Sequence, residues 1–132
     1  MGYGKIVECF VVLTRIEKHD SSLHDLVLRL EAKNRYDEID SEVPVYWNGE
    51  EGDKAGQMDV WTLQEFNDRK DRFTYWEVKT GYSDKSLPTA KSQFNKVYSA
   101  LKKNYELDDV NIRFVYYNPY TNTIKHYRPH NV

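Results

Sequence analysis

Residues 72–81 read RFTYWEVKTG and set two charged side chains, Glu77 and Lys79, near the end of a run of aromatic and β-branched residues. Side chains alternate between the two faces of a strand, so Glu77 and Lys79 emerge on the same side as Phe73 and Tyr75, with about 7 Å between alternate residues. The run is bulky on both faces, which is typical of a strand that is covered on both sides. Charged groups in such a strand need a compensating partner, whereas on an exposed edge they would form only a weak surface pair.

The preceding segment supplies a second carboxylate. Residues 57–66, QMDVWTLQEF, predict a strand, and the polar residues 67–71 predict the turn of an antiparallel hairpin. This hairpin would bring Asp59 close to Glu77, and two carboxylates can share one Mg²⁺ or Mn²⁺ ion. Such an ion lowers the pKa of a bound water and polarises a phosphodiester, while Lys79 can position the water or stabilise developing negative charge. The pattern therefore favours hydrolysis of a nucleic-acid backbone.

Two segments have the apolar periodicity of amphipathic helices. In residues 20–38 the apolar stripe consists of Leu23, Leu26, Val27 and Leu30, and Asp20 or Ser21 is the predicted N-cap. In residues 82–106 the stripe consists of Phe94, Val97, Tyr98 and Leu101. Pro88 is expected in the first turn of this second helix.

The remaining β-prone runs complete an α/β fold. Residues 5–13 favour a strand, although so short an apolar run can equally begin a helix, and residues 43–47 favour an edge strand. Residues 110–118 and 123–128 are separated by turn-forming residues and predict a closing hairpin. The order of these elements predicts a mixed sheet with helices packed on it.

Composition sets limits on the class of protein. A length of 132 residues predicts a single domain over residues 1–132, with enough chain to bury a core. No apolar run approaches the roughly 20 residues that cross a bilayer, and the apolar N-terminal run lacks the cleavage site of a signal peptide, so we expect a cytoplasmic protein. The single cysteine, Cys9, cannot form an internal disulfide and is expected to be a small core residue.

The charge distribution changes sign at the Glu77–Lys79 pair. The net charge of −2 gives no overall signature of nucleic-acid binding. From Glu17 to Glu77 there are sixteen acidic against eight basic residues, whereas residues 79–103 contain six lysines and one acid, Asp84. An acidic half beside a basic segment suits a cation site next to a phosphate-attracting surface, although a lysine-rich helix face is equally often only solvated.

An Asp, a hairpin to Glu-x-Lys and a following helix resemble the PD-(D/E)xK nuclease superfamily. MDV at residues 58–60 and YWEVKTG at residues 75–81 are particularly similar to archaeal Holliday-junction resolvases and their virus-encoded relatives, and there is a further likeness to RecB-like nuclease domains. The resemblance spans about residues 23–117. Met58 stands where the family commonly has Pro. The resemblance implies a restriction-endonuclease-like fold, with a mixed central sheet flanked by helices.

The resemblance also implies roles for individual residues. It assigns Asp59, Glu77 and Lys79 to catalysis, with Mg²⁺ or Mn²⁺ held by Asp59, Glu77 and the carbonyl of Val78. Gln93 corresponds to the Gln that orients the attacked phosphate in RecB-like domains. Four residues rather than three separate it from Tyr98, which puts a role for that Tyr in doubt. Gln93 can equally be an ordinary polar residue beside the helix core.

The family commonly takes another metal ligand from its first helix. At about 100° per residue, the apolar stripe leaves His24 and Glu31 together on one border of the predicted helix. His24 is the preferred ligand, since RecB-like domains carry a His on this helix, and Glu31 is the alternative. Either residue can instead be a surface side chain with no catalytic part.

These observations predict a Mg²⁺- or Mn²⁺-dependent deoxyribonuclease that acts on intermediates of replication or recombination. Like the resolvases, it is expected to form a homodimer with DNA as its partner. Lysines near the second helix are expected to contact phosphates, namely Lys85, Lys91, Lys96, Lys102 and Lys103. Tyr82 can stack on a base. The alternatives are an inactive nucleic-acid-binding or protein-interaction module of the same fold, and a nuclease that cleaves RNA.

Overall fold

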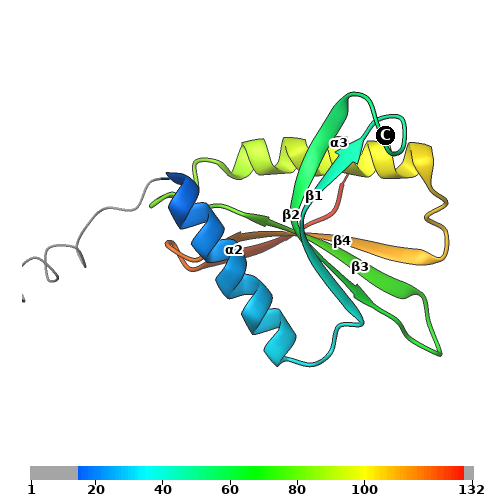
Figure 1. Ribbon diagram of the computed structural model, residues 1–132, viewed down its shortest axis with the longest axis horizontal. Coiled ribbons are helices and arrows are strands. Elements are labelled where there is room, and N and C mark those ends of the chain that lie inside the picture. The colour runs from blue at the N-terminus through cyan, green and yellow to red at the C-terminus, as the bar shows by residue number, and fades with distance from the viewer. Residues whose placement is uncertain (1–14, 130–132) are drawn as a thin grey trace, which may run out of the picture.

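The computed structural model describes residues 15–129 (Figure 1). Its elements follow the order α2 (Arg15–Ala32), β1 (Glu38–Tyr46), β2 (Lys54–Gln64), β3 (Asp71–Val78), α3 (Leu87–Asn104), β4 (Val110–Asn118) and β5 (Thr123–Tyr127). Within these residues the fold is α/β, with a five-stranded mixed sheet flanked by two helices. The strand predicted for residues 5–13, and Cys9 with it, lie outside the described residues. Neither α2 nor α3 is long and apolar enough to cross a membrane.

The strands lie in the sheet in the order in which they occur along the chain. Neighbours pair antiparallel except β3 and β4, which are parallel. Parallel neighbours need a crossover connection, and α3 supplies it. In the β2–β3 pair Val60 lies opposite Trp76 and Leu63 opposite Phe73, so the antiparallel hairpin predicted from residues 57–66 and 72–80 is confirmed. The closing hairpin of β4 and β5 is confirmed as well.

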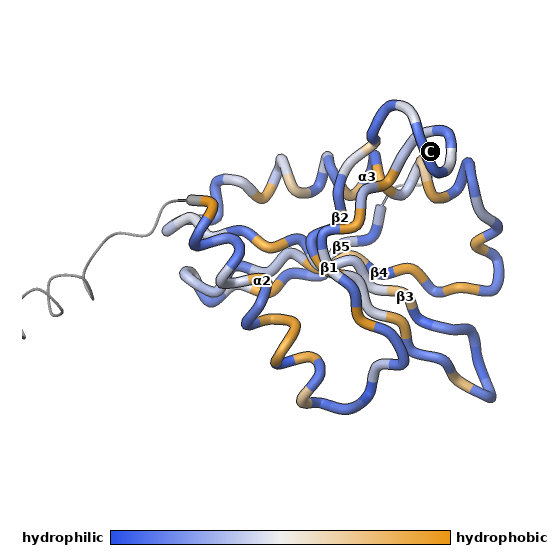
Figure 2. Tube along the Cα trace, in the orientation of Figure 1, coloured by the Kyte–Doolittle hydropathy of each residue, from blue (hydrophilic) through white to orange (hydrophobic). Residues whose placement is uncertain are grey.

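Helix α3 covers one face of the sheet with the buried side chains Ala90, Phe94, Val97 and Ala100. Pro88 lies in its first turn, where the missing N–H costs no hydrogen bond. Phe94 meets the ring of Tyr75 edge-on, with 5.1 Å between the ring centroids. Gly56 in β2 permits the close approach of the helix, because a Cβ there would lie 3.0 Å from Val97 Cγ2. Figure 2 shows apolar positions recurring along both helices.

Helix α2 packs Leu23, Leu26 and Leu30 against Val60 and Val78 of the sheet. The predicted start of this helix at residues 20–21 is wrong, because the helix begins at Arg15. No Gly or Pro occurs between Arg15 and Ser21 to stop the helix from extending toward the N-terminus. The extension adds more than one turn to the helix, and His19 lies in it.

The helix also ends earlier than predicted, at Ala32 rather than near residue 38. Asn34 takes the left-handed conformation, with φ of 50°, that commonly terminates helices. The chain then enters β1 at Glu38, five residues before the strand predicted at residues 43–47. The polar residues that begin β1 are accepted because β1 is an edge strand of the described sheet.

A carboxylate ties the loop after β3 to the β4–β5 hairpin. Asp84 accepts hydrogen bonds from Tyr116 Oη at 2.8 Å, from Thr121 Oγ1 at 2.8 Å and from Thr123 Oγ1 at 2.7 Å. Asn118 Nδ2 donates to both Asp84 and the carbonyl of Gly81. These hydrogen bonds, that of Thr123 most of all, hold the pKa of Asp84 below its ordinary value. The cluster fixes the loop that directly follows Lys79.

Removing one donor from this cluster is expected to destabilise the fold. Tyr116→Phe leaves the ring in its buried position but deletes the hydroxyl that donates to Asp84. Loss of a hydrogen bond to a charged group is expected to lower the free energy of unfolding. Urea denaturation followed by circular dichroism measures this change. An unchanged midpoint would show that the cluster does not stabilise the loop.

Candidate active site

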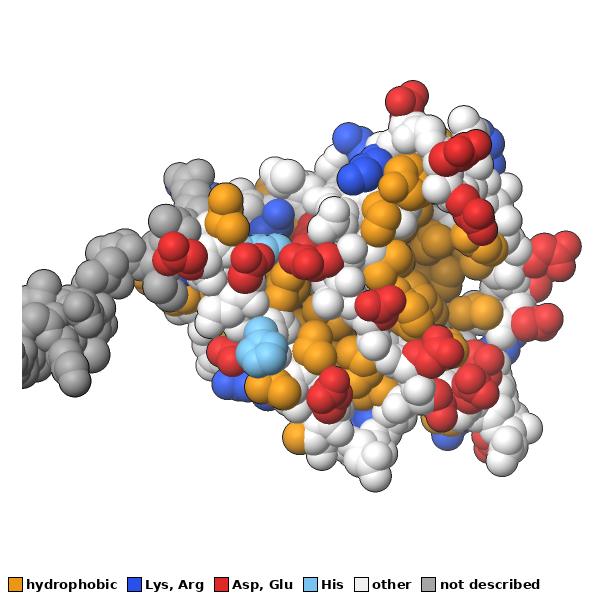
Figure 3. Space-filling view, in the orientation of Figure 1, with side chains coloured by type: hydrophobic (Ala, Val, Ile, Leu, Met, Phe, Trp, Pro, Cys, Tyr) orange, Lys and Arg blue, Asp and Glu red, His pale blue; other side chains and the backbone are white. Residues whose placement is uncertain are grey.

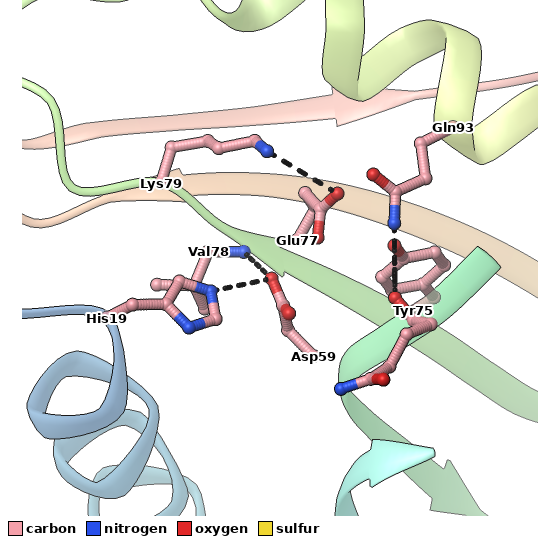
Figure 4. Close-up of polar contacts among 8 residues, drawn as sticks. His19, Asp59, Tyr75, Glu77, Val78, Lys79 and Gln93 are labelled. Atoms are coloured by element: carbon pink, nitrogen blue, oxygen red, sulfur yellow. Dashed lines mark hydrogen bonds and ion pairs between the residues drawn. The ribbon is translucent and has the colours of Figure 1, made fainter. Parts of the chain in front are cut away.

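Two buried carboxylates meet where β2 and β3 run side by side (Figure 4). Asp59 is 7% exposed and Glu77 is 2% exposed. The β2–β3 pairing ends at Val60 and Trp76, and Asp59 is the residue of β2 just outside this last pair. Its Oδ2 accepts a hydrogen bond of 2.8 Å from the backbone N–H of Val78. This bond fixes the Asp59 side chain against β3, beside Glu77. The predicted convergence of Asp59 and Glu77 is therefore confirmed.

Glu77 shares hydrogen bonds with Asp59 and Tyr75, but one of its two carboxylate oxygens has no hydrogen-bond partner. Its Oε2 is buried with no hydrogen-bond donor, and the nearest cation, Lys79 Nζ, lies 3.9 Å away. Burial, followed by a hydrogen bond with Asp59 and the charge of Asp59, raises the pKa of Glu77 to about 9. The metal-free pair therefore keeps a proton at neutral pH, which a divalent cation would replace.

Asp59 holds the negative charge of the pair. Burial opposes its ionisation, but hydrogen bonds from His19, Glu77 and the N–H of Val78 together lower the pKa of Asp59 below its ordinary value. His19 Nε2 lies 3.4 Å from Asp59 Oδ2. The hydrogen bond to Asp59 raises the pKa of His19, although burial opposes this change. An imidazolium at His19 would neutralise the Asp59 carboxylate.

The structure brings His19, rather than His24 or Glu31, to the carboxylates. His24 is exposed and lines a small hollow beside Asp20, and Glu31 is exposed in the last turn of α2. Five residues of helix turn His24 about 140° away from His19. The pattern already contained a signal for His19, because it continues the stripe of Leu23 at the i, i+4 spacing. The predicted N-cap at residues 20–21 excluded His19 from the helix.

Gln93 reaches the site indirectly. Its Nε2 donates to the carbonyl of Gln57 at 3.2 Å, and Tyr75 Oη donates to the same carbonyl at 3.2 Å. Burial and then the charges of Glu77 and Asp59 raise the pKa of Tyr75, so its hydroxyl stays protonated. Figure 4 shows Gln93 descending from α3 toward Tyr75, with Glu77 beside it. Gln93 therefore fixes the backbone of β2 next to Asp59.

Tyr98, in contrast, lies away from the carboxylates. Its ring packs edge-on against Phe114, with 6.0 Å between centroids, and it lines a hollow near the start of β4. With four residues between Gln93 and Tyr98, the Tyr98 side chain thus lies away from the carboxylates that Gln93 adjoins.

Exposed aromatic rings lie on the segments next to the site. Tyr82, three residues after Lys79, is 74% exposed, and its ring meets that of Tyr120 edge-on with 5.4 Å between centroids. Lys18, the neighbour of His19, donates from Nζ to Tyr82 Oη at 2.9 Å. The beginning of α2, the loop after β3 and the β4–β5 turn therefore meet at one surface that carries rings and a cation.

The two carboxylates suit a hard divalent cation. Within residues 15–129 no three His, Cys, Asp or Glu side chains are grouped to hold a metal ion. The protein would therefore offer carboxylate oxygens of Asp59 and Glu77, including the buried Oε2 that lacks a donor. Mg²⁺ commonly binds through one or two carboxylates and keeps several waters. The donor set fits Mg²⁺ or Mn²⁺ in this way.

Comparison of the chain with protein-family models, with curated proteins and with solved structures found no match.

Proposed function

We propose that this chain is a Mg²⁺- or Mn²⁺-dependent nuclease of the PD-(D/E)xK type that hydrolyses phosphodiester bonds of DNA. One observation carries the proposal. The buried Oε2 of Glu77 has no hydrogen-bond donor, and it stands beside a second carboxylate, Asp59, and the ammonium of Lys79. The cost of burying such a group is explained when a cation occupies the site during function. The proposal includes a restriction-endonuclease-like arrangement of the sheet.

Asp59 and Glu77 would hold the cation, with the carbonyl of Val78 as a further ligand. A bound Mg²⁺ or Mn²⁺ generates a nucleophilic water near neutral pH and polarises the phosphate. Lys79 is half-buried, and its ammonium faces Glu77, where it can orient that water and stabilise negative charge on the phosphate. A charge held in a partly dry site acts more strongly than one in open solvent.

His19 and Gln93 act as positioning residues in this proposal. His19 donates to Asp59 and so sets the orientation of a metal ligand, in place of the role expected for His24. Gln93 holds the carbonyl of Gln57, two residues before Asp59, and thereby steadies the strand that carries this carboxylate.

The substrate assignment draws on the surface next to the site. Exposed rings at Tyr82 and Tyr120 offer stacking surfaces for unpaired bases, as proteins that bind single strands do. Lys18 adds a cation that suits a phosphate. We therefore propose DNA with unpaired or branched segments as the substrate. A symmetric homodimer is part of the proposal and rests on the family resemblance alone.

Cleavage assays with four labelled substrates test the proposal: single-stranded DNA, duplex DNA, four-way junctions and single-stranded RNA, each with Mn²⁺. Cleavage of DNA is expected, and Lys79→Ala is expected to lower its rate by about a hundredfold. Lys33→Ala, which removes an exposed lysine just after α2, is the matched control and should leave the rate unchanged. Cleavage of RNA alone would show that the substrate is RNA rather than DNA. An absence of cleavage, or a Lys79→Ala rate equal to that of wild type, would refute the assignment.

A further inference from the structure

A second charged surface lies at the opposite end of β3 from Glu77. It is a hollow of about 710 Å³ whose basic lining residues are Arg69, Lys70, Arg72, Arg113, His126 and Arg128. We call it the basic hollow. None of the described residues that line it is acidic. The face of the molecule in Figure 3, in contrast, carries more acidic than basic side chains. The positive charge of the basic hollow would therefore attract an anionic ligand.

Two arginines of the basic hollow lack anionic partners. Arg72 of β3 lies opposite Asn111 of β4. Arg113 is two residues after Asn111 in β4, so its side chain lies on the same face of the sheet as that of Arg72. Within the described part of the chain, neither arginine has an acidic side chain within 4.0 Å, whereas the exposed Arg69 is paired with Asp68.

Arg72 shows the effect of this crowding. Its Nε is buried and has no hydrogen-bond acceptor. Burial first, and then the positive charges of Arg113 and Arg69, lower the pKa of Arg72 below its ordinary value. The like charges repel one another in the absence of a ligand, and a bound anion would supply both the missing acceptor and the missing charge. Guanidinium groups match the oxygen geometry of phosphate.

Aromatic rings and two more cations border the same hollow from the α3 face of the sheet, opposite to the face that carries Arg72 and Arg113. Tyr98 and Tyr127, which are both half-buried, line the basic hollow, whereas Phe114 lines it but is fully buried. Lys102 Nζ lies 5.6 Å from the centre of the Tyr98 ring, and Lys91 Nζ lies 5.8 Å from that of Tyr127. Basic groups that follow a phosphate chain, with aromatic rings interspersed, are typical of surfaces that bind nucleic acid. An acidic peptide would use the charges but would have less use for the rings.

We propose that the basic hollow binds backbone phosphates of a nucleic-acid segment, with Arg72 and Arg113 as its central contacts. Arg72 and Glu77 lie five positions apart on β3, about 17 Å along the strand, and this odd spacing puts their side chains on opposite faces of the sheet. The identification of the bound segment as part of the cleaved substrate rests on the proposed function, whereas phosphate binding by the basic hollow does not.

Binding measured in EDTA separates this proposal from catalysis. Fluorescence anisotropy with a labelled duplex and a labelled single strand, between 50 and 200 mM salt, gives the affinity and its salt slope. Replacing both Arg72 and Arg113 by Gln is expected to weaken binding about tenfold and to reduce the slope of log K against log salt by about two for duplex. Arg113→Gln alone removes an exposed side chain, and it should give about half of the change in slope.

The control removes the same charge elsewhere. Arg29→Gln combined with Arg35→Gln changes two exposed arginines at the end of α2 and just beyond it, and it should leave affinity and slope near wild type. Equal losses in the control pair, or wild-type affinity in both Arg113→Gln and the Arg72/Arg113 double variant, would overturn the proposal. Displacement of the labelled DNA by millimolar inorganic phosphate or by poly-glutamate, as effectively as by unlabelled DNA, would overturn it too. If binding behaves as expected while no substrate is ever cleaved, the proposed function fails and the basic hollow stands.

Discussion

Glu77→Gln is expected to lower the rate of Mn²⁺-dependent DNA cleavage by about a thousandfold or more. The substitution keeps the size of the side chain but removes the negative charge from the carboxylate whose buried Oε2 has no donor. With Asp59 as the only remaining carboxylate, the cation would be held weakly and out of place. The expected loss is therefore of the order seen when a main electrostatic contact of a transition state is removed. Initial rates over a range of Mn²⁺ concentrations measure it.

Glu65→Gln is the matched control for this substitution. Glu65 follows the last residue of β2 and is exposed, so the same change of charge is made outside the site. Its cleavage rate should equal that of wild type. If Glu77→Gln retained a tenth of the wild-type rate at saturating Mn²⁺, Glu77 would not be a ligand that catalysis requires.

The thermal stability of the metal-free chain is expected to fall as the pH rises from about 5 to about 9. The pKa of Glu77 is raised from 4.5 to about 9, so between these values the folded chain binds more protons than the unfolded chain. Stability then decreases with increasing pH. The raised pKa of His19 acts in the same direction. The melting temperature in EDTA should drop by about 5 °C or more, which corresponds to roughly 1 kcal/mol in a domain of this size.

Two further measurements identify the source of this pH dependence. Glu77→Gln removes the titrating group, so its melting temperature should change less between pH 5 and pH 9 than that of wild type. Mn²⁺ binds only the folded site and should raise the wild-type melting temperature most at the alkaline end, where it competes with the fewest protons. A wild-type melting temperature in EDTA that stays level or rises over this interval would contradict the placement of Glu77.

The hairpin and the carboxylate pair were predictable because their signals are local. The run of large apolar residues around Tyr75 fixes a buried strand, and the polar residues 67–71 fix the turn. These two features set the register that brings Asp59 beside Glu77. The apolar stripe of α3 was predictable in part for a similar reason: Phe94 and Val97 of the predicted stripe are buried, and Ala90 and Ala100 complete the buried face.

The position of His19 was not predicted because the limits of a helix depend weakly on sequence. Asp20 and Ser21 are good N-cap residues, but no Gly or Pro between Arg15 and Ser21 stops the helix from extending past them. The basic hollow was missed for another reason. Arg72 and Arg113 are far apart in sequence and adjoin only through the parallel pairing of β3 and β4.

Calorimetric titration of the metal-free protein with Mn²⁺ tests most directly whether Asp59 and Glu77 share one divalent ion. The expected result is one ion bound per chain near neutral pH, with binding weakened at least tenfold by Asp59→Asn and by Glu77→Gln and unchanged by Glu65→Gln. Wild-type protein that binds no Mn²⁺, or affinity that survives both carboxylate substitutions, would contradict a metal site between β2 and β3.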